Sequence, residues 1–224
     1  MIGKALSRLA TAAWVFLSAA SALSAGPAPW ADSFVGRLEA LALIESLNAD
    51  LLSHDSATLT LERWCADHRL ADPALIVAER VHDVDKPATA EVRAALDVKP
   101  DEPLGYRRVR LKCGEKVLSE ADNWYVPARL TPEMNRVLET TDTPFGKAVA
   151  GLHFRRHTLK ADLLWRPLPA GWEMGAAAAP EEASGLAIPG HVLEHRAVLL
   201  TDGEPFSEVV ETYTGDVLAF PPPK

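Results

Sequence analysis

LGYRRVRLKCGEKVLSEADNWYVP, residues 104–127, holds two strand-like runs on either side of a Gly-Glu-Lys turn. Successive side chains of an extended strand point to opposite faces. Arg107 then shares a face with Val109 and Leu111, whereas Arg108 lies on the other face. An arginine among apolar side chains is costly unless an anionic group meets it. The stretch predicts an antiparallel hairpin with a charge on its core side, although a structural ion pair or an arginine that reaches water is an alternative.

A second hairpin is predicted near the C-terminus, with strands at 192–200 and 206–220 around a Thr-Asp-Gly-Glu-Pro turn. Its sequence echoes the first hairpin, and further strands are expected at 74–84 and 154–164. Echoing hairpins separated by helices predict an α+β fold with a single antiparallel sheet and the helices packed on one side.

Glu211 interrupts an apolar row on the last strand, because it shares a face with Val209 and Tyr213. Each buried charge alone is more typical of structure than of function. Together, one on each echoing hairpin, Arg107 and Glu211 predict a polar pair on one sheet face. A plain buried salt bridge between the two residues is the alternative.

Apolar periodicity predicts helices at 33–52, from 57 to about 68, and at 90–96. Threonine followed by proline predicts two further helix starts, one with Thr131 as N-cap and one with Thr143 as N-cap. The second helix would run to Ala150. Its first backbone N–H groups, at Phe145 and Gly146, could donate to an anion, and an ordinary capped helix start is the alternative.

The 224-residue chain carries a formal charge of −8 and no dense run of Lys or Arg, which argues against a nucleic-acid surface. Residues 1–25 combine two early cations, an apolar run and small residues, so we predict a cleaved signal peptide and a periplasmic or secreted protein. A retained anchor is the alternative, and the protein would be cytoplasmic if the segment is misassigned. After cleavage we expect no stable membrane span, a single domain at 26–224, a loop insertion around 165–190, and a monomer.

Cysteine and histidine patterns give no metal signature. Cys65 and Cys113 allow one disulfide in an oxidising compartment, but we expect two buried free thiols. The seven histidines are expected to be surface or ordinary polar residues rather than metal ligands. No phosphate-binding loop or serine-triad motif is visible.

Several short motifs, in this order, resemble those of chorismate pyruvate-lyase over roughly residues 40–220. They are residues 51–58 (LLSHDSAT), the Tyr-Arg-Arg-Val-Arg-Leu strand with its Gly-Glu turn, Val126-Pro127, Thr143-Pro144-Phe145-Gly146, and Gly203-Glu204-Pro205 with Glu211. Fold relatives of that family include the UTRA ligand-binding domain of bacterial repressors. The resemblance implies one antiparallel sheet with a ligand enclosed beneath flap-like helices.

The resemblance also implies an activity, the cleavage of chorismate to 4-hydroxybenzoate and pyruvate without a cofactor. It places substrate binding at Ala57, Arg107, Phe145 and Glu211, with Arg107 and Glu211 also catalytic. Ala57 and Phe145 stand where the family has Met-type and Leu residues, which implies a changed pocket shape. The segment from Pro205 to Glu211 is one residue longer than in the family, so either a bulge is expected there or the acidic position falls on another residue.

The alternative function is an exported, non-catalytic binding module of the same fold. In both cases the partner is a small aromatic carboxylate. The predicted signal peptide favours the module, because chorismate is a cytosolic intermediate and the known lyases act inside the cell.

Overall fold

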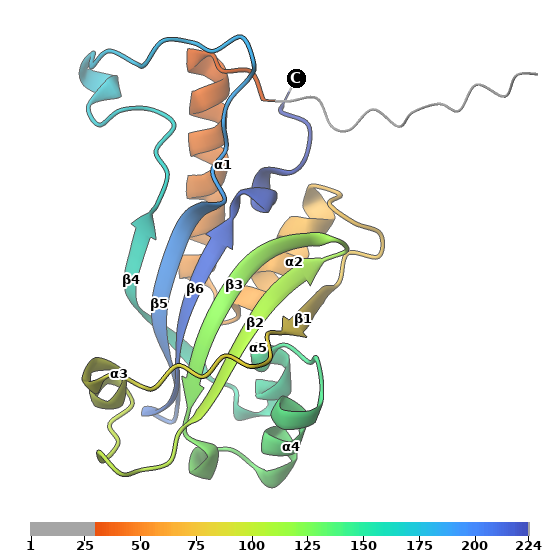
Figure 1. Ribbon diagram of the computed structural model, residues 1–224, viewed down its shortest axis with the longest axis vertical. Coiled ribbons are helices and arrows are strands. Elements are labelled where there is room, and N and C mark those ends of the chain that lie inside the picture. Colours follow the sequence, from red (N-terminus) through yellow and green to blue (C-terminus); the bar gives the residue numbers. More distant parts are fainter. Residues whose placement is uncertain (1–29, 224) are drawn as a thin grey trace, which may run out of the picture.

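The computed structural model describes residues 30–223 (Figure 1). The predicted signal peptide at 1–25 lies outside these residues. No helix in the described part is long and apolar enough to cross a membrane.

Six strands form a single antiparallel sheet in the order β1-β2-β3-β6-β5-β4. Their bounds are β1 Ile76–Arg80, β2 Gly105–Cys113, β3 Lys116–Tyr125, β4 Arg155–Leu163, β5 His191–Thr201 and β6 Glu204–Thr214. The predicted α+β class with one antiparallel sheet is therefore confirmed. The predicted strands at 74–84 and 206–220 are too long, because pairing stops at Arg80 and at Thr214.

The two echoing hairpins, β2–β3 and β5–β6, lie on either side of the sheet's centre, where β3 pairs with β6. Each contains a bulge in its second strand. The pairing skips Leu118 in β3 and Phe206 in β6, and both residues are fully buried. The bulge at Phe206 lies between Pro205 and Glu211, where a bulge was expected, and Val209, Glu211 and Tyr213 lie on the buried face.

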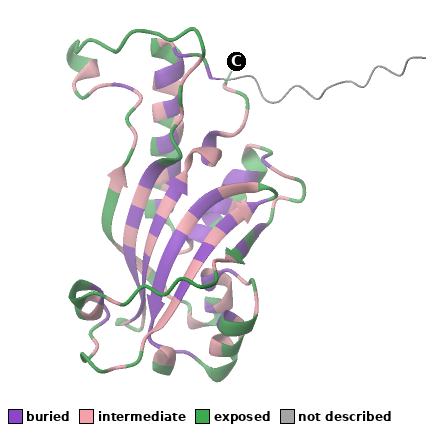
Figure 2. Cartoon of the chain, in the orientation of Figure 1, coloured by how far each residue is buried: buried purple, intermediate pink, exposed green. Residues whose placement is uncertain are grey.

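Four of the five α-helices in the described residues cover the inner face of the sheet, which is the face that carries Arg107 and Glu211. The helices are α1 Phe34–Ser53, α2 Ala57–Asp67, α3 Ala90–Ala95, α4 Pro132–Thr140 and α5 Phe145–Ala148, with 3-10 turns at Pro127–Arg129, Ala150–Leu152, Trp172–Met174 and Gly215–Leu218. α1 buries Ala40, Ile44, Leu47 and Leu51 on one stripe against the strands (Figure 2). Each of the larger side chains contributes about 1.5–3 kcal/mol by burial.

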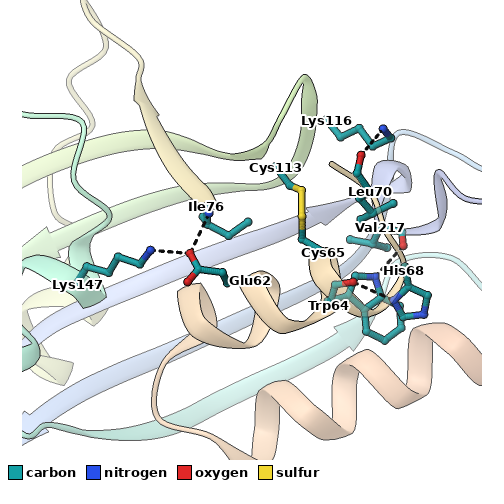
Figure 3. The surroundings of a disulfide bond; sticks show 10 residues. All are labelled: Glu62, Trp64, Cys65, His68, Leu70, Ile76, Cys113, Lys116, Lys147 and Val217. Atoms are coloured by element: carbon teal, nitrogen blue, oxygen red, sulfur yellow. Dashed lines mark hydrogen bonds and ion pairs between the residues drawn. A yellow bond between two sulfur atoms is a disulfide. The ribbon is translucent and has the colours of Figure 1, made fainter. Parts of the chain in front are cut away.

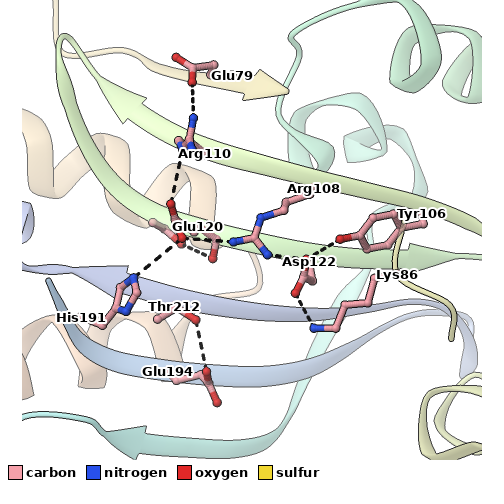
Figure 4. Close-up of polar contacts among 11 residues, drawn as sticks. Glu79, Lys86, Tyr106, Arg108, Arg110, Glu120, Asp122, His191, Glu194 and Thr212 are labelled. Carbon is pink, nitrogen blue, oxygen red and sulfur yellow. Dashed lines mark hydrogen bonds and ion pairs between the residues drawn. The ribbon is translucent and has the colours of Figure 1, made fainter. Parts of the chain in front are cut away.

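The short helix α3 corrects the expectation that all helices lie on one side. Its Val92 and Leu96 pack against Trp124 and Val210, which belong to the outer face. The rest of the outer face carries charged ladders, such as Arg110 between Glu79 and Glu120 (Figure 4).

α5 begins differently from the prediction. Pro144, rather than Thr143, is its N-cap residue, and no side chain caps it. The hydroxyl of Thr143 is engaged by Thr141 instead, because Thr141 Oγ1 donates to it at 2.9 Å. The helix ends after one turn, at Ala148.

Cys65 on α2 and Cys113 at the end of β2 form a disulfide (Figure 3). Our expectation of two free thiols is therefore wrong. α2 crosses the end of β2 and brings the two Cα atoms to 6.4 Å, a separation that a disulfide can span. Their separation of 48 residues in sequence gave no sign of this approach.

The predicted insertion at 165–190 is held against the start of α1. Arg37 is the centre of this contact: its Nε donates to Asp32 at 2.5 Å, and its two Nη atoms donate to the carbonyl oxygens of Ala179 and Pro180. The backbone N–H of Glu182 donates to the same Asp32 carboxylate. The insertion therefore lies against the first turns of α1, near the point where the described residues begin (Figure 1).

Candidate functional site

A cavity lies between the inner face of the sheet and the first residues of α2 and α5. The space between its walls amounts to about 520 Å³, counting the part open to solvent. Its polar walls include Ser56, Thr58, Asn123, Arg107, Arg156 and Glu211. Its apolar walls include Val109, Leu111, Ala121, Phe154, Leu199 and Val209. All four predicted site residues, Ala57, Arg107, Phe145 and Glu211, line this one cavity.

Arg107 lies on the inner face of β2, as the alternation predicted, and is 3% exposed. Its Nη1 donates to the carbonyl of Thr143 at 2.8 Å and its Nη2 to the carbonyl of Thr141 at 3.0 Å. These carbonyls belong to the link between α4 and α5, at a helix end where backbone acceptors lack internal partners. Arg107 therefore holds the segment that carries Phe145 in place.

The charge of Arg107 has no carboxylate partner within residues 30–223. Its Nε is buried and has no hydrogen-bond partner there either. Burial, helped by the nearby charge of Arg80, lowers the pKa of Arg107 to about 10. The guanidinium thus stays charged at neutral pH, in a place where an anion would relieve the cost of its burial.

Glu211 pairs with Arg156 of β4 and not with Arg107. Arg156 Nη2 lies 2.5 Å from Glu211 Oε2, and the two side chains are 4% and 7% exposed. Arg107 and Glu211 therefore share the inner face, as predicted, but the alternative of a salt bridge between them is wrong. The sheet register explains this. Arg107 of β2 is paired with Asn123 of β3, and Asn123 is paired with Val209 of β6. Glu211 lies two residues further along β6 and is paired with Ala121 instead.

Arg156 is the site residue that sequence reasoning missed. Its segment, Phe154-Arg155-Arg156-His157, resembles the Tyr-Arg-Arg start of β2, and that repeat was the available signal. The alternation gave no help, because β4 is an edge strand whose Leu159 is exposed and whose register shifts between Thr158 and Lys160. Burial opposes the charge of Arg156, but the carboxylate of Glu211 still raises the pKa of the guanidinium above its usual value.

A buried polar group lies next to this ion pair. Tyr213 donates its hydroxyl to Glu211 Oε2 at 3.1 Å. Burial, reinforced by the Glu211 carboxylate, raises the pKa of Tyr213 well above its usual value. His195, the partner of Glu211 on β5, is fully buried and has its Nε2 2.8 Å from Asn48 Oδ1. Burial lowers the pKa of His195 to about 4, so its ring is neutral at neutral pH.

The starts of α2 and α5 meet at the cavity. Ser56 caps α2 by accepting from the backbone N–H of Leu59. Gly146 is close enough that a Cβ there would lie 3.3 Å from Ser56 Oγ. Lys147 of α5 pairs with Glu62 of α2 at 2.6 Å (Figure 3). The disulfide on α2 and this ion pair therefore position both helix starts.

Phe145 forms the aromatic part of the wall. Its ring stacks on Phe206 with centroids 6.4 Å apart, and it lies 5.7 Å from the ring of Tyr125. Ala57 is buried and contributes a small side chain at the start of α2. The structure thus places both residues at the cavity, and their roles in binding stay predictions.

The arrangement combines two buried guanidiniums, one buried carboxylate and apolar walls. Asp55 lies at the rim, where it meets the exposed Arg155. Apart from that rim residue, the buried charges sum to one positive charge. Within residues 30–223, no group of three His, Cys, Asp or Glu side chains is placed to hold a metal ion.

The chain is similar to the "Uncharacterized protein y4mC" of Sinorhizobium fredii (strain NBRC 101917 / NGR234). The two are 57% identical over 196 residues, which cover 87% of this chain and 83% of that protein. No protein-family model matches the chain.

Two solved structures show weaker likenesses, in the arrangement of strands and helices. The effector domain of PhnF from Mycobacterium smegmatis is 13% identical with a TM-score of 0.46, covering 72% of this chain and 90% of that chain. The possible transcriptional regulator YydK from Bacillus subtilis subsp. subtilis str. 168 is 18% identical with a TM-score of 0.36. The match covers 62% of this chain and 58% of the YydK chain.

Proposed function

The chain belongs to the same family as the protein y4mC of Sinorhizobium fredii, and from its cavity we propose that it binds a small aromatic carboxylate. The observation that carries this proposal is Arg107. A buried guanidinium whose described partners are only backbone carbonyls lacks charge compensation. A ligand carboxylate supplies that compensation through charge-assisted hydrogen bonds.

The rest of the cavity suits an aromatic ring. Apolar residues from three strands, Val109, Leu111, Ala121 and Val209 among them, face the ring of Phe145 across the cavity. One net positive charge matches a monocarboxylate better than a dicarboxylate, because a second anionic group would be left without compensation.

The resemblance to chorismate pyruvate-lyase supports a catalytic form of this proposal. Chorismate would lose a proton from the ring carbon that bears the hydroxyl, the bond between ring carbon and ether oxygen would break, and the ring would become aromatic. The proton then ends on the methylene carbon of the departing enolpyruvyl group, so pyruvate and 4-hydroxybenzoate form without water or an oxidant. Arg107 would hold the ring carboxylate, and Glu211 would accept a hydrogen bond from the ring hydroxyl.

Two observations favour binding without turnover. Glu211 Oε2 already accepts hydrogen bonds from Arg156 and Tyr213, so this oxygen is engaged within the protein. The Cys65–Cys113 disulfide is typical of an oxidising compartment, and the predicted signal peptide agrees with export. Chorismate is a cytosolic intermediate, so we place the binding module first and the lyase second.

A mixing experiment separates the two forms. Purified protein is titrated with 4-hydroxybenzoate while its melting temperature is followed, and is incubated separately with chorismate while product is measured by chromatography. Ligand at 100 times its Kd should stabilise the fold by about 2.7 kcal/mol. Binding without product above the uncatalysed background supports the module, and product formation supports the lyase. No thermal shift with any aromatic carboxylate contradicts both.

A further inference from the structure

The two edges of the sheet are closed to different extents. The sheet ends at β1 on one side and at β4 on the other, and an edge strand carries backbone N–H and C=O groups that no neighbouring strand pairs. At β1 the rest of the chain takes up outward donors. The N–H of Ile76 donates to the carboxylate of Glu62 at 3.0 Å, and the N–H of Ala78 donates to the carbonyl of Asp142 at 3.2 Å. The edge at β1 therefore has little to offer a further strand.

At β4 only the first residues are covered. The N–H of Arg156 donates to the Asp55 carboxylate at 2.8 Å, which blocks the edge beside the cavity. Beyond the register shift between Thr158 and Lys160, the strand continues to Leu163 along the left margin of the sheet in Figure 1. Residues 159–161 are exposed there. The open part of this edge is therefore the second half of β4.

Two backbone N–H groups point outward from the open part. The N–H of Leu164 donates to the carbonyl of Val192 on β5. Successive residues of an antiparallel strand point their N–H groups in opposite directions, so those of Ala161 and Leu163 face away from β5. Outside the sheet, neither group donates to another segment within residues 30–223. These donors and the matching carbonyls can pair with one more strand.

The charges on either side of Ala161 indicate which strand fits. Lys160 and Asp162 flank Ala161, lie on the outer face of β4 and form an exposed ion pair with each other. A second β4 that runs antiparallel and is centred on the same alanine places its Asp162 opposite Lys160 and its Lys160 opposite Asp162. Opposite charges directly across two strands stabilise the pairing, and like charges destabilise it. The edge is thus complementary to a second copy of itself.

The same register suits the backbone and the apolar side chains. It brings the outward N–H and C=O groups of the two copies of Ala161 opposite each other, as in a hydrogen-bonded pair of an antiparallel sheet. It also brings Leu159, which is 45% exposed, beside Leu163 of the second copy. A twofold axis at Ala161 relates the two copies, so each contact occurs twice.

Two features of β4 usually protect a strand edge, namely a lysine and a bulge. A lysine prevents pairing where the approaching strand offers no negative charge. Asp162 offers that charge to Lys160 in the antiparallel register centred on Ala161. The features therefore restrict the partner and its register rather than close the edge.

We propose that the second half of β4 is an interaction surface for a second copy of this chain, and that antiparallel pairing about Ala161 joins two six-stranded sheets into one. The dimer replaces the monomer that we expected from the sequence. The surface lies outside the cavity, so this inference does not rest on the proposed function.

The test measures the dissociation constant of the dimer by sedimentation equilibrium, using the protein expressed from the full chain. The charge variants are Lys160→Asp and Asp162→Lys. Ala161→Pro removes the central outward N–H, at an edge position where the fold tolerates proline. The control Glu115→Lys also changes a carboxylate to a lysine, but its side chain is fully exposed at the β2–β3 turn.

The wild type and Glu115→Lys should form dimers of equal affinity. Each charge variant should dimerise roughly 10- to 100-fold more weakly, because two attractive pairs become repulsive. An equimolar mixture of the two charge variants should form a heterodimer of near wild-type affinity, because the two lysines of one chain then face the two aspartates of the other. Native mass spectrometry identifies this heterodimer, since the variants differ in mass. Ala161→Pro should be a monomer.

The inference is overturned if the wild type stays a monomer as its concentration is raised, because the edge then serves another partner or none. It is also overturned if the dimer persists unchanged in both charge variants, which would place the contact on another surface. If Ala161→Pro does not fold, the mixture carries the test, and two weakened variants that fail to form the heterodimer overturn the register. Binding of aromatic carboxylates is measured separately and is untouched by these outcomes.

Discussion

Arg156 of β4 and Glu211 of β6 form an ion pair of 2.5 Å across the inner face of the sheet, with both side chains almost completely buried. Strand β5 lies between them, so the pair joins an edge strand to the centre of the sheet. Through Tyr213, which donates to the same carboxylate oxygen, the pair also contacts the buried core. The pair is thus part of both the fold and the cavity.

Breaking this ion pair should destabilise the protein strongly. Arg156→Ala leaves the buried Glu211 carboxylate uncompensated, which costs about 3–5 kcal/mol. Arg155→Ala, on the exposed side of the same strand, should change the free energy of unfolding by about 0.5 kcal/mol or less. Urea unfolding of both variants measures the difference, and equal losses would show that the Arg156–Glu211 pair is not buried as described.

Removing the disulfide should also lower stability. The Cys65–Cys113 bond closes a loop of 48 residues in sequence separation, and chain entropy predicts a loss of about 4 kcal/mol for Cys65→Ala/Cys113→Ala. The urea midpoint of the variant, compared with the wild type without reductant, gives the loss. A non-reducing peptide map that recovers both cysteines as free thiols would contradict the disulfide itself.

The buried His195 predicts a loss of stability in mild acid. Its pKa is lowered in the folded protein from 6.5 to about 4, so the unfolded chain takes up a proton in this range and the folded protein does not. The stability that His195 contributes is therefore complete above pH 6.5 and is lost as the pH falls toward 4. The free energy of unfolding should fall by roughly 1 kcal/mol per pH unit, as an order of magnitude, over this window.

Replacing the histidine checks the assignment. His195→Gln should flatten the slope of stability against pH between 6.5 and 4, even if the variant is less stable at all pH values. His157→Gln, at an exposed position on β4, should keep the wild-type slope. An unchanged slope in His195→Gln would show that another group titrates there.

The sheet was predictable from sequence because its strands carry regular signals. The alternation in β2 placed Arg107 inside and Arg108 outside, and the echo between the hairpins indicated their common sheet. The disulfide was not predictable, because it depends on how α2 crosses β2. The cap at Thr143 failed for a local reason: Thr141 engages the hydroxyl that would otherwise cap α5.

That the four predicted residues would line one cavity was predictable from sequence, but the pairing of their charges was not. Arg107, Glu211, Phe145 and Ala57 all reach one cavity. Which charge meets Glu211 depends on the strand order and register, which place Arg107 opposite Val209 and leave Glu211 to Arg156. Strand order is a long-range property, and an edge strand without apolar alternation gives no sign of which side chain it buries.

Binding of 4-hydroxybenzoate to Arg107→Met and Arg108→Met tests whether the buried guanidinium is the carboxylate-binding group. The two arginines are neighbours on β2, but Arg108 lies on the outer face, where it meets Glu120 and Asp122 (Figure 4). Melting temperatures show whether both variants fold. Arg107→Met should bind 4-hydroxybenzoate roughly 10- to 100-fold more weakly than the wild type, because it loses a charge-assisted hydrogen bond to the ligand. Arg108→Met should bind as the wild type does. Wild-type affinity in Arg107→Met, or loss of binding in Arg108→Met alone, would contradict the proposed site.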